Sequence, residues 1–397
     1  MRSVRIIQLA RLDDDERTSP ACGAKELSPA LQRWVAARRK PESLHGRHII
    51  SFMTLSNDFI LSLPKAELHL HLEGTVDPET LAELSRRHPT PLATTNNRYR
   101  NIEDSGRVFT EEEARELYQY KHFTGFLWAF KAVTERLRTA DDYELVTYRM
   151  MQKLHAQNVV HAEVYVSVGV VQWRGQEFAP LFEGLERGRL RGERDFGVSL
   201  YWIFDATRHF GVEEAQRVVE EAIRCRDRDV IGVGLGGDER RAAPEQFSAV
   251  YEHAAKHGLR LTVHAGETLG PESIWPALRE LKADRIGHGL RAIEDQELVR
   301  YIAEKRIPVE ICITSNVLTG CCAEVRQHPI RQLFDAGVLV TLNTDDPDMF
   351  HTTLANEYQI AQQVFGFNED ELRELANNSF RASFLPEEKK REMLAKF

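Results

Sequence analysis

Seven residues in the sequence are of types that bind metal ions or transfer protons, and each stands at or just after a short apolar segment. They are His69, His71, His264, Glu267, His288, Asp345 and Asp346. Imidazole nitrogens and carboxylate oxygens are the donors of catalytic zinc sites, which leave one position for water. The same side chains serve as general acids and bases. The set therefore predicts hydrolytic metal chemistry, provided that the fold brings these residues together.

His69 and His71 are two positions apart in the strand-like segment 66–72. Residues i and i+2 of a strand face the same side and lie about 7 Å apart, so both imidazoles can reach one ion. A pair of this kind can equally be two polar residues that are hydrogen-bonded to neighbouring carbonyls. A third histidine and an aspartate at the ends of other strands favour the metal site.

The segment TVHAGE (262–267) carries His264 and Glu267. Ala265 and Gly266 are small, so the chain can turn there and direct Glu267 into a cavity. Burial raises the pKa of a carboxyl group, which suits a general acid. The alternative is a carboxylate that stabilises the N-terminus of a helix.

His288 stands between two glycines, and Asp345 and Asp346 stand side by side before Pro347. Two adjacent carboxylates in an apolar setting repel each other unless a cation or hydrogen-bond donors offset the charge. A metal ion bound by one of them would do so. An exposed helix N-cap would also fit this aspartate pair.

Eight short, apolar, β-branched segments could position these residues. They are residues 66–72, 159–167, 197–205, 230–236, 259–267, 285–289, 307–315 and 337–346. Helical patterns, such as those at 212–226 and 244–258, alternate with them, which is typical of a parallel sheet with crossover helices. Eight repeats predict an α/β fold, a (β/α)8 TIM-type barrel, with active-site groups at the C-terminal ends of the strands. The alternative, a doubly wound open sheet, needs a Gly-rich phosphate loop after its first strand, and HLHLEGTVDPET is not one.

Residues 75–158 are expected to form a mostly helical insertion after the first strand. Within it, residues 109–137 are expected to pack over the barrel mouth, with Phe123, Phe126, Leu127 and Phe130 as lid or core residues.

The composition narrows the class of protein. Of the 397 residues, 42% are hydrophobic, and the formal net charge of −9 does not favour nucleic-acid binding. No apolar run is long enough for a transmembrane helix, so no membrane association is expected. The five cysteines form no CxxC pair, which is typical of free thiols in a reducing cytoplasm.

Residues 1–52 differ from the rest, with ten Lys or Arg and six Asp or Glu. They are expected to be an N-terminal extension that is disordered or not native, because Met53 would be a natural start. Residues 53–397 are expected to form the catalytic domain.

From about Leu63 onward the sequence resembles the adenosine deaminase family. The resemblance rests on PKAELHLHLEG, GGDE (236–239), TVHAGE, ESIWPAL, RIGHGLRAIED, TSNVLTG and LNTDDP, in this order. It implies one Zn²⁺ per chain, with His69, His71, His264 and Asp345 as ligands. Glu267 matches the residue that protonates purine N1, and His288 the one that helps to deprotonate or orient the attacking water. Asp346 matches the group that bonds N7, and Gly237 the backbone contact to N3.

The implied reaction is zinc-dependent hydrolytic deamination of a 6-aminopurine nucleoside, of the adenosine-to-inosine type, with release of ammonia. A zinc ion lowers the pKa of bound water toward 7. A binuclear amidohydrolase would usually need a bridging lysine, and residues 230–236 contain none. The HxE…PCxxC signature of the base-editing deaminases is incomplete, because HAE (161–163) is followed by no PCxxC. A metal- or purine-binding protein without catalysis is a remote alternative, since Glu267 and His288 are both present.

Of two departures from the family pattern, one concerns the polar support of the site and the other the substrate. The family's usual DLAGDE is here GLGGDE, so Gly234 replaces an acid. Glu73 replaces an aspartate that bonds the ribose 5′-hydroxyl, and its side chain is about 1.5 Å longer. Alternative substrates are therefore free adenine and 6-aminodeoxyfutalosine, a menaquinone precursor. Arg174 could meet an anionic tail, but a solvated loop arginine is the expectation. The segment NTDDPDMFHTTLANEY resembles nucleoside-type members, which favours a nucleoside.

Overall fold

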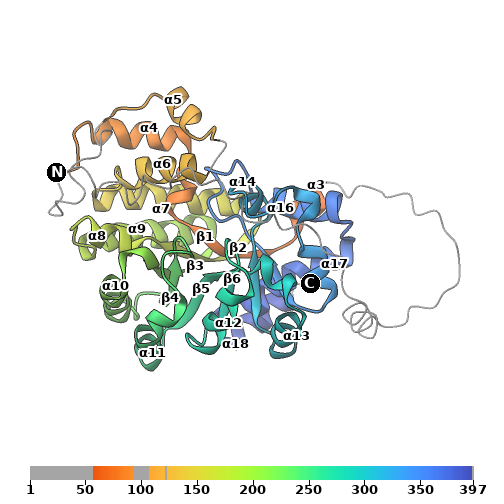
Figure 1. The fold of residues 1–397 in the computed structure, drawn as a ribbon. Helices are drawn as coiled ribbons and strands as arrows, with labels where there is room; N and C mark the ends of the chain where they lie inside the picture. The colour runs from red at the N-terminus through yellow and green to blue at the C-terminus, as the bar shows by residue number, and fades with distance from the viewer. Residues whose placement is uncertain (1–56, 93–106, 121–122, 396–397) are drawn as a thin grey trace, which may run out of the picture.

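The computed structural model describes residues 57–92, 107–120 and 123–395, and its centre is a parallel barrel (Figure 1). All eight predicted strands are present, and they pair in sequence order from β1 to β8. They are β1 (Lys65–His71), β2 (Val159–Val166), β3 (Ser199–Thr207), β4 (Val230–Gly236), β5 (Arg260–Ala265), β6 (Arg285–His288), β7 (Pro308–Ile311) and β8 (Leu339–Leu342). The (β/α)8 barrel is therefore confirmed. Residues 1–52 lie outside the described residues.

The barrel closes through the segment that follows β8. Leu70 of β1 forms a parallel bridge with Asp345. The Asp345 N–H donates to the His69 carbonyl (3.0 Å), and the His71 N–H donates to the Asp345 carbonyl (2.8 Å). The backbone that carries the first two predicted ligands is thereby tied to the backbone of a third.

Helices surround the barrel in Figure 1. After β2 they are α8 (Val168–Trp173), α9 (Ala179–Phe196), α10 (Val212–Arg224), α11 (Ser248–Lys256), α12 (Pro271–Arg279), α13 (Gln296–Lys305), α14 (Ile313–Leu318), α15 (Ile330–Asp335), α16 (Leu354–Phe365), α17 (Glu369–Ala382) and α18 (Glu387–Leu394). The short α3 (Asn57–Ser62) precedes β1. None of the described helices is both long and apolar enough to cross a membrane.

Two predicted strands extend four residues beyond the observed ends. The segment 307–315 ends as a strand at Ile311, and α14 starts at Ile313. Its first turn is held by the Glu357 carboxylate, which accepts from the Thr314 N–H (3.2 Å) and from the Thr314 hydroxyl. The segment 337–346 likewise ends as a strand at Leu342, so Asp345 and Asp346 lie in the loop that follows β8.

Between β1 and β2 the described residues form α4 (Pro78–Arg87), α5 (Glu111–Leu117), α6 (Phe123–Thr134) and α7 (Ala140–His155). Tyr120, after α5, donates from its hydroxyl to the Met349 carbonyl (2.6 Å), and Phe126 stacks on Phe350 at 5.0 Å. These contacts bring α6 beside the loop that follows β8. The side chains of Phe126, Leu127 and Phe130 are half-buried, whereas that of Phe123 lies outside the described part of the chain.

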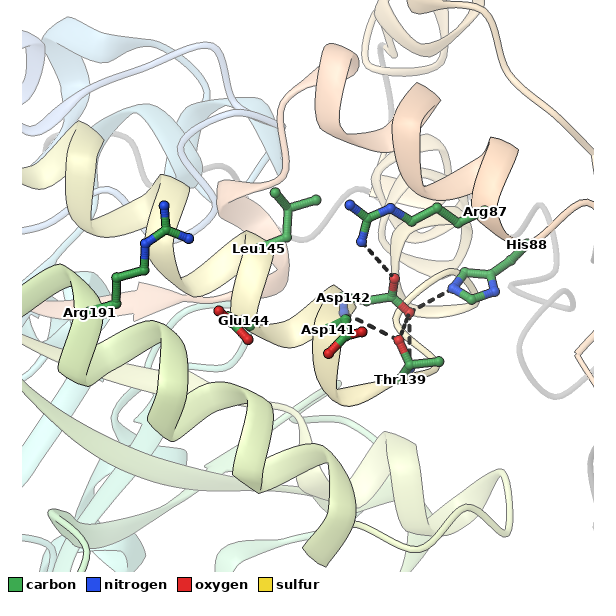
Figure 2. Close-up of a pocket in the computed structure, with 8 residues that line it drawn as sticks. All are labelled: Arg87, His88, Thr139, Asp141, Asp142, Glu144, Leu145 and Arg191. Atoms are coloured by element: carbon green, nitrogen blue, oxygen red, sulfur yellow. Dashed lines mark hydrogen bonds and ion pairs between the residues drawn. The ribbon is translucent and has the colours of Figure 1, made fainter.

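The N-terminus of α7 ties the two ends of this helical segment together (Figure 2). The Asp142 carboxylate accepts from the Thr139 N–H (2.9 Å) and from the His88 imidazole (2.6 Å), and Arg87 lies at 3.4 Å. The shallow, charged pocket drawn there is lined by residues of α4, α7 and α9 and their flanks. It contains none of the seven residues that the sequence predicted to be reactive, so we do not consider it the catalytic site.

A buried charge network crosses the interior of the barrel. Arg285 of β6 lies 2.5 Å from a carboxylate oxygen of Glu310 on β7 and pairs with Glu163 on β2. All three side chains are fully buried. The Arg285 guanidinium also stacks over the Phe384 ring at 3.8 Å, and the Phe384 N–H donates to Glu163. One guanidinium therefore pairs with two fully buried carboxylates.

We expect Arg285→Ala to destabilise the fold strongly, because it leaves two buried carboxylates without their cation. Removing one partner from a buried ion pair costs about 3–5 kcal/mol. The denaturation midpoint should fall accordingly. Arg187→Ala is the matched control, since Arg187 pairs with Asp141 and Glu144 but its side chain is 46% exposed. An exposed pair contributes about 0–1 kcal/mol. Equal shifts for the two variants would contradict this account.

Candidate metal centre and catalytic site

His69, His71, His264 and Asp345 lie together at the C-terminal end of the barrel, and we call them the His3Asp cluster. One potential ligand atom from each lies within 4.8 Å of the others, and all four residues are buried. The Nε2 atoms of His71 and His264 are 3.3 Å apart. Asp345 Oδ1 is 3.5 Å from His69 Nε2 and 3.4 Å from His71 Nε2.

His69 is oriented by the buried charge network below it. Its Nδ1 lies 2.7 Å from Glu310 Oε2, so Nδ1 donates its hydrogen to that carboxylate and Nε2 faces the cluster. The Nε2 atom is buried and has no hydrogen-bond partner among the described residues. A histidine ligand usually donates its second N–H to a carboxylate in this way. The orphaned Nε2 atom therefore fits a metal ion.

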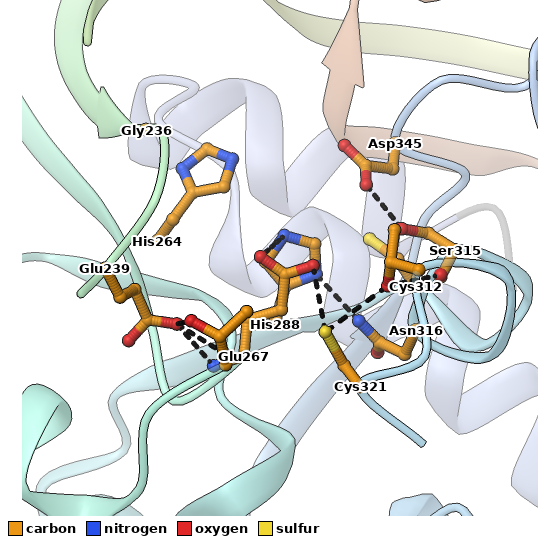
Figure 3. A network of polar contacts seen from close by, with 12 residues as sticks. Gly236, Glu239, His264, Glu267, His288, Cys312, Ser315, Asn316, Cys321 and Asp345 are labelled. Atoms are coloured by element: carbon orange, nitrogen blue, oxygen red, sulfur yellow. Dashed lines mark hydrogen bonds and ion pairs between the residues drawn. The ribbon is translucent and has the colours of Figure 1, made fainter. Parts of the chain in front are cut away.

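Asp345 is fixed in the same manner. The Ser315 hydroxyl donates to Asp345 Oδ2 (2.6 Å), which leaves Oδ1 facing the histidines (Figure 3). Burial alone would raise the pKa of Asp345, but its contact with His69 and its electrostatic interactions with the surrounding histidines hold it well below its usual range. Asp345 is thus ionised. Three imidazole nitrogens and one carboxylate oxygen suit a divalent metal that activates water for hydrolysis.

Metal uptake by the metal-free protein should release a proton. Burial lowers the pKa of His69, but its contacts with Asp345 and Glu310 outweigh burial and raise it to about 10. At pH 8, below that pKa, His69 is protonated, and it must lose this proton to bind a metal. Calorimetric titration in buffers of different ionisation enthalpy should detect release of about one proton.

Glu310→Gln provides the comparison for that experiment. It keeps the size of the side chain and removes the carboxylate that holds the His69 proton. We expect less proton release and metal binding about 10- to 100-fold weaker. Release of no proton by the unaltered protein would contradict the protonation of His69.

Glu267 is positioned by Glu239, the last residue of the GGDE motif. The buried Glu239 carboxylate accepts from the N–H groups of Gly266 (3.0 Å), Glu267 (2.9 Å) and Thr268 (2.8 Å), and from the Ser273 hydroxyl. Gly266 has a positive φ of 72°, and a side chain there would overlap Ile274. Sequence reasoning used GGDE as a family motif but assigned no task to Glu239.

The position of Glu267 makes it an acid at neutral pH. Burial first, and then the charges of Asp345 and Glu239, raise its pKa to about 8. Its Oε2 lies 3.6 Å from His288 Nε2, and its Oε1 lies 3.7 Å from the Cys321 thiol. A protonated carboxyl group at this place can donate to a ring nitrogen of a bound ligand.

A chain of hydrogen bonds fixes the tautomer of His288. The Ile330 N–H donates to His328 Nδ1 (3.2 Å), so His328 Nε2 carries a hydrogen and donates to Asn316 Oδ1 (3.2 Å). The Asn316 amide then donates to His288 Nδ1 (3.0 Å). Burial lowers the pKa of both histidines to about 3, so both rings are neutral. His288 therefore carries its hydrogen on Nε2, which faces Glu267, and acts there as a donor.

Asn316→Ala should impair this donor. Without the amide, His288 can adopt the other tautomer and lose its Nε2 hydrogen. We expect kcat to fall by at least about tenfold, with a smaller change in KM. Nitrogen-15 shifts of the imidazole should report the tautomer. Asn378→Ala, which removes another buried amide, on α17, is the control. An unchanged kcat would show that the relay does not matter.

Asp346 and Glu73 each have one buried oxygen without a hydrogen-bond partner among the described residues, Oδ1 and Oε2 respectively. Burial and the charge of Asp345 raise the pKa of Asp346 well above its usual range, so it can donate a hydrogen bond. Gly74 makes room for it, since a Cβ there would lie 2.3 Å from Asp346 Oδ1. The other oxygen of Glu73 accepts from the Ser167 N–H (3.0 Å).

Gly237, the predicted N3 contact, follows β4 with a positive φ of 86° and is exposed at the mouth.

Arg174 was predicted wrongly to be a solvated loop residue. It is 2% exposed and donates to the carbonyl and hydroxyl of Thr134, because it ends the short helix α8 beneath α6. Its positive charge opposes the rise in the pKa of Glu73 that burial causes.

The fold is a (β/α)8 barrel with a possible metal-binding group at the ends of its strands, and comparison with known proteins defines the class of protein. A family model described as adenosine deaminase matches residues 64–397. The chain therefore belongs to the adenosine deaminase family.

Several relatives carry more particular names. An aminodeoxyfutalosine deaminase from Streptomyces avermitilis is 38% identical over 83% of this chain and 88% of its own length. An adenine deaminase from Wolinella succinogenes is 32% identical over 86% and 99%. The crystal structure of an adenine deaminase from Arthrobacter aurescens matches with a TM-score of 0.76 and 30% identity, over 84% and 98%. This protein is thus a purine deaminase, a hydrolase that acts on a carbon–nitrogen bond and binds a small purine.

Proposed function

We propose that the protein catalyses zinc-dependent hydrolytic deamination of a 6-aminopurine nucleoside and releases ammonia. Residues 53–397 would form the deaminase domain. The observation that carries the proposal is the position of Glu267. It is a half-buried carboxyl group whose pKa is raised to about 8, 3.6 Å from a neutral histidine and beside the His3Asp cluster. Three imidazoles and one carboxylate suit zinc among the divalent metals.

The chain's own residues divide the work around a purine ring. Glu267 donates its proton to N1, which makes C6 electron-poor. His288 offers its Nε2 hydrogen to the charge that develops on the attacking oxygen. Asp346 is held in its acid form and so matches N7, which is an acceptor. The N–H of Gly237 does the same for N3. Each donor meets an acceptor on a different edge of the base.

The candidate substrates differ in the group attached to N9 of the purine. Glu73 is 1% exposed, and its unpartnered oxygen needs a donor from the ligand. A nucleoside provides such donors through its hydroxyl groups. Free adenine is a weaker candidate for the same reason. The Streptomyces relative favours aminodeoxyfutalosine as the second candidate.

The test offers adenosine, adenine and 6-aminodeoxyfutalosine in turn to the zinc-loaded protein. Turnover of each compound is measured as loss of the adenine absorbance. We expect one of the two nucleosides to give the highest kcat/KM. Glu267→Gln should keep zinc and lose about 10²- to 10⁴-fold in kcat, the usual contribution of a general acid.

Two outcomes would count against the proposal. Turnover of none of the three compounds would overturn the reaction, and tight purine binding without ammonia release would then favour a non-catalytic protein. Near-normal rates in Glu267→Gln would remove Glu267 from the acid role. Glu272→Gln, an exchange of the same kind on the outer helix α12, is the matched control.

A further inference from the structure

The seam between β8 and β1, where the barrel closes, is held partly by side chains. In the part of the chain that the structure describes, strand pairing at this seam is limited to the bridge of Leu70 with Asp345. Just before that bridge the Asn343 side chain takes over. Its Oδ1 atom accepts from the N–H of Leu68 (2.9 Å) and from the N–H of His69 (3.2 Å). One amide oxygen thus satisfies two consecutive backbone donors.

The two N–H groups that Asn343 binds belong to a β-bulge in β1. Glu67 is paired with Ala162 of β2 and Leu70 with Val164, so three steps along β1 match two steps along β2. A bulge of this kind inserts an extra residue and leaves it outside the regular ladder. Both bulge residues are fully buried, and a buried N–H group without an acceptor is costly. The bulge therefore depends on the acceptor that Asn343 provides.

The bulge decides which way His69 points. Residues two positions apart in a regular strand share a face. Glu67 and His69 do not, because Glu67 borders a cavity lined by residues of α7, whereas His69 contacts Glu310 inside the barrel. One extra residue moves every later side chain of a strand to the opposite face. In an unbulged β1, His69 and His71 would both face the surrounding helices.

Asn343 is itself held firmly in place. Its N–H donates to the Ile311 carbonyl (2.9 Å), which continues the pairing of β7 with β8. Its Nδ2 atom donates to the Thr341 hydroxyl (3.0 Å), and its side chain is fully buried. Asn343 also stands two residues before Asp345. A single segment after β8 thus contains one potential ligand and the support for another, His69.

We propose that Asn343 is a positioning residue for the metal ligands, because its side-chain amide holds the β-bulge that turns His69 and His71 into the barrel. This inference rests on the proposed function, since the ligands in question are those of the proposed zinc site, and it deepens that function. Asn343 acts through the backbone of β1 and touches neither imidazole nor substrate. Such a supporting residue affects metal binding although no ligand is altered.

The test measures the zinc affinity of Asn343→Ala by competition with a chelator of known affinity. Without the amide, the two bulge N–H groups lose their acceptor, and the imidazoles of His69 and His71 lose their fixed direction. Loss of a residue that orients a ligand weakens metal binding about 10- to 100-fold, and we expect a loss in this range. An unchanged zinc affinity would overturn the proposal.

Asn343→Asp is the conservative variant, because it keeps an oxygen atom at the same distance from the backbone. It should bind zinc at least about tenfold more tightly than Asn343→Ala. If Asn343→Ala does not fold, Asn343→Asp decides the matter against the unaltered protein, and its zinc affinity should lie within about tenfold of that reference. A larger loss in Asn343→Asp would contradict the role of the accepting oxygen.

Ser379→Ala is the matched control on the same seam. The fully buried Ser379 Oγ accepts from the Ala66 N–H (2.9 Å), which precedes the bulge. Both alanine variants should lower the denaturation midpoint of the metal-free protein, because each removes an acceptor from buried backbone. Ser379→Ala should nevertheless leave the zinc affinity unchanged. An equal loss of zinc affinity in both variants would overturn the proposal and leave Asn343 as a structural residue.

Zinc affinity is measured without turnover, so failure of this inference and failure of the proposed function can be told apart. If the unaltered protein bound zinc but deaminated no purine, the proposed reaction would fail, and the comparison of Asn343→Ala with Ser379→Ala would still decide the role of Asn343. If purines were deaminated but Asn343→Ala bound zinc normally, the inference alone would fail.

Discussion

Closure of the barrel and assembly of the His3Asp cluster depend on the same pair of backbone hydrogen bonds. The Asp345 N–H and carbonyl bind the backbone of His69 and His71, so the two strand ends can meet only if these three residues are together. His264 lies on β5, across the barrel from β1, and is in register with Gly287 of β6. The chemistry therefore sits where a cylinder of strands must close, and it needs no separate scaffold.

Burial then assigns different protonation states to carboxyl groups that lie close together. Asp345 stays ionised because histidines surround it, while its neighbour Asp346 is driven to the neutral form by burial and by Asp345 itself. Glu267 becomes an acid for related reasons. One site thus contains a potential ligand anion and two hydrogen-bond donors, all made from the same functional group. Titratable groups with divided tasks commonly mark catalytic sites.

Much of this could be predicted from the sequence because strands carry a local signal. All eight strands were found from apolar runs, and the reactive residues were recognised because each stands at or just after the end of one. The supporting residues could not be found in this way. Glu310 binds His69 across 241 positions of the chain, and His328 acts on His288 only through Asn316. Such tasks exist only when distant strand ends meet. Arg174 was predicted wrongly because the sequence around it looks like a loop, whereas the fold buries the residue against the end of α6.

His288 and Asp345 share a backbone feature that bears on how the protein could change. Both have left-handed φ angles, 60° and 67°, which side chains other than glycine adopt at a cost. His288 is the last residue of β6, and Asp345 lies in the loop that follows β8. The turn at each position directs the side chain inward. Glycine at either position would relieve the strain, but it would also remove a buried side chain and its hydrogen bond with Asn316 or Ser315. The strained backbone and the reactive group are therefore kept together, at a cost in stability that selection for activity maintains.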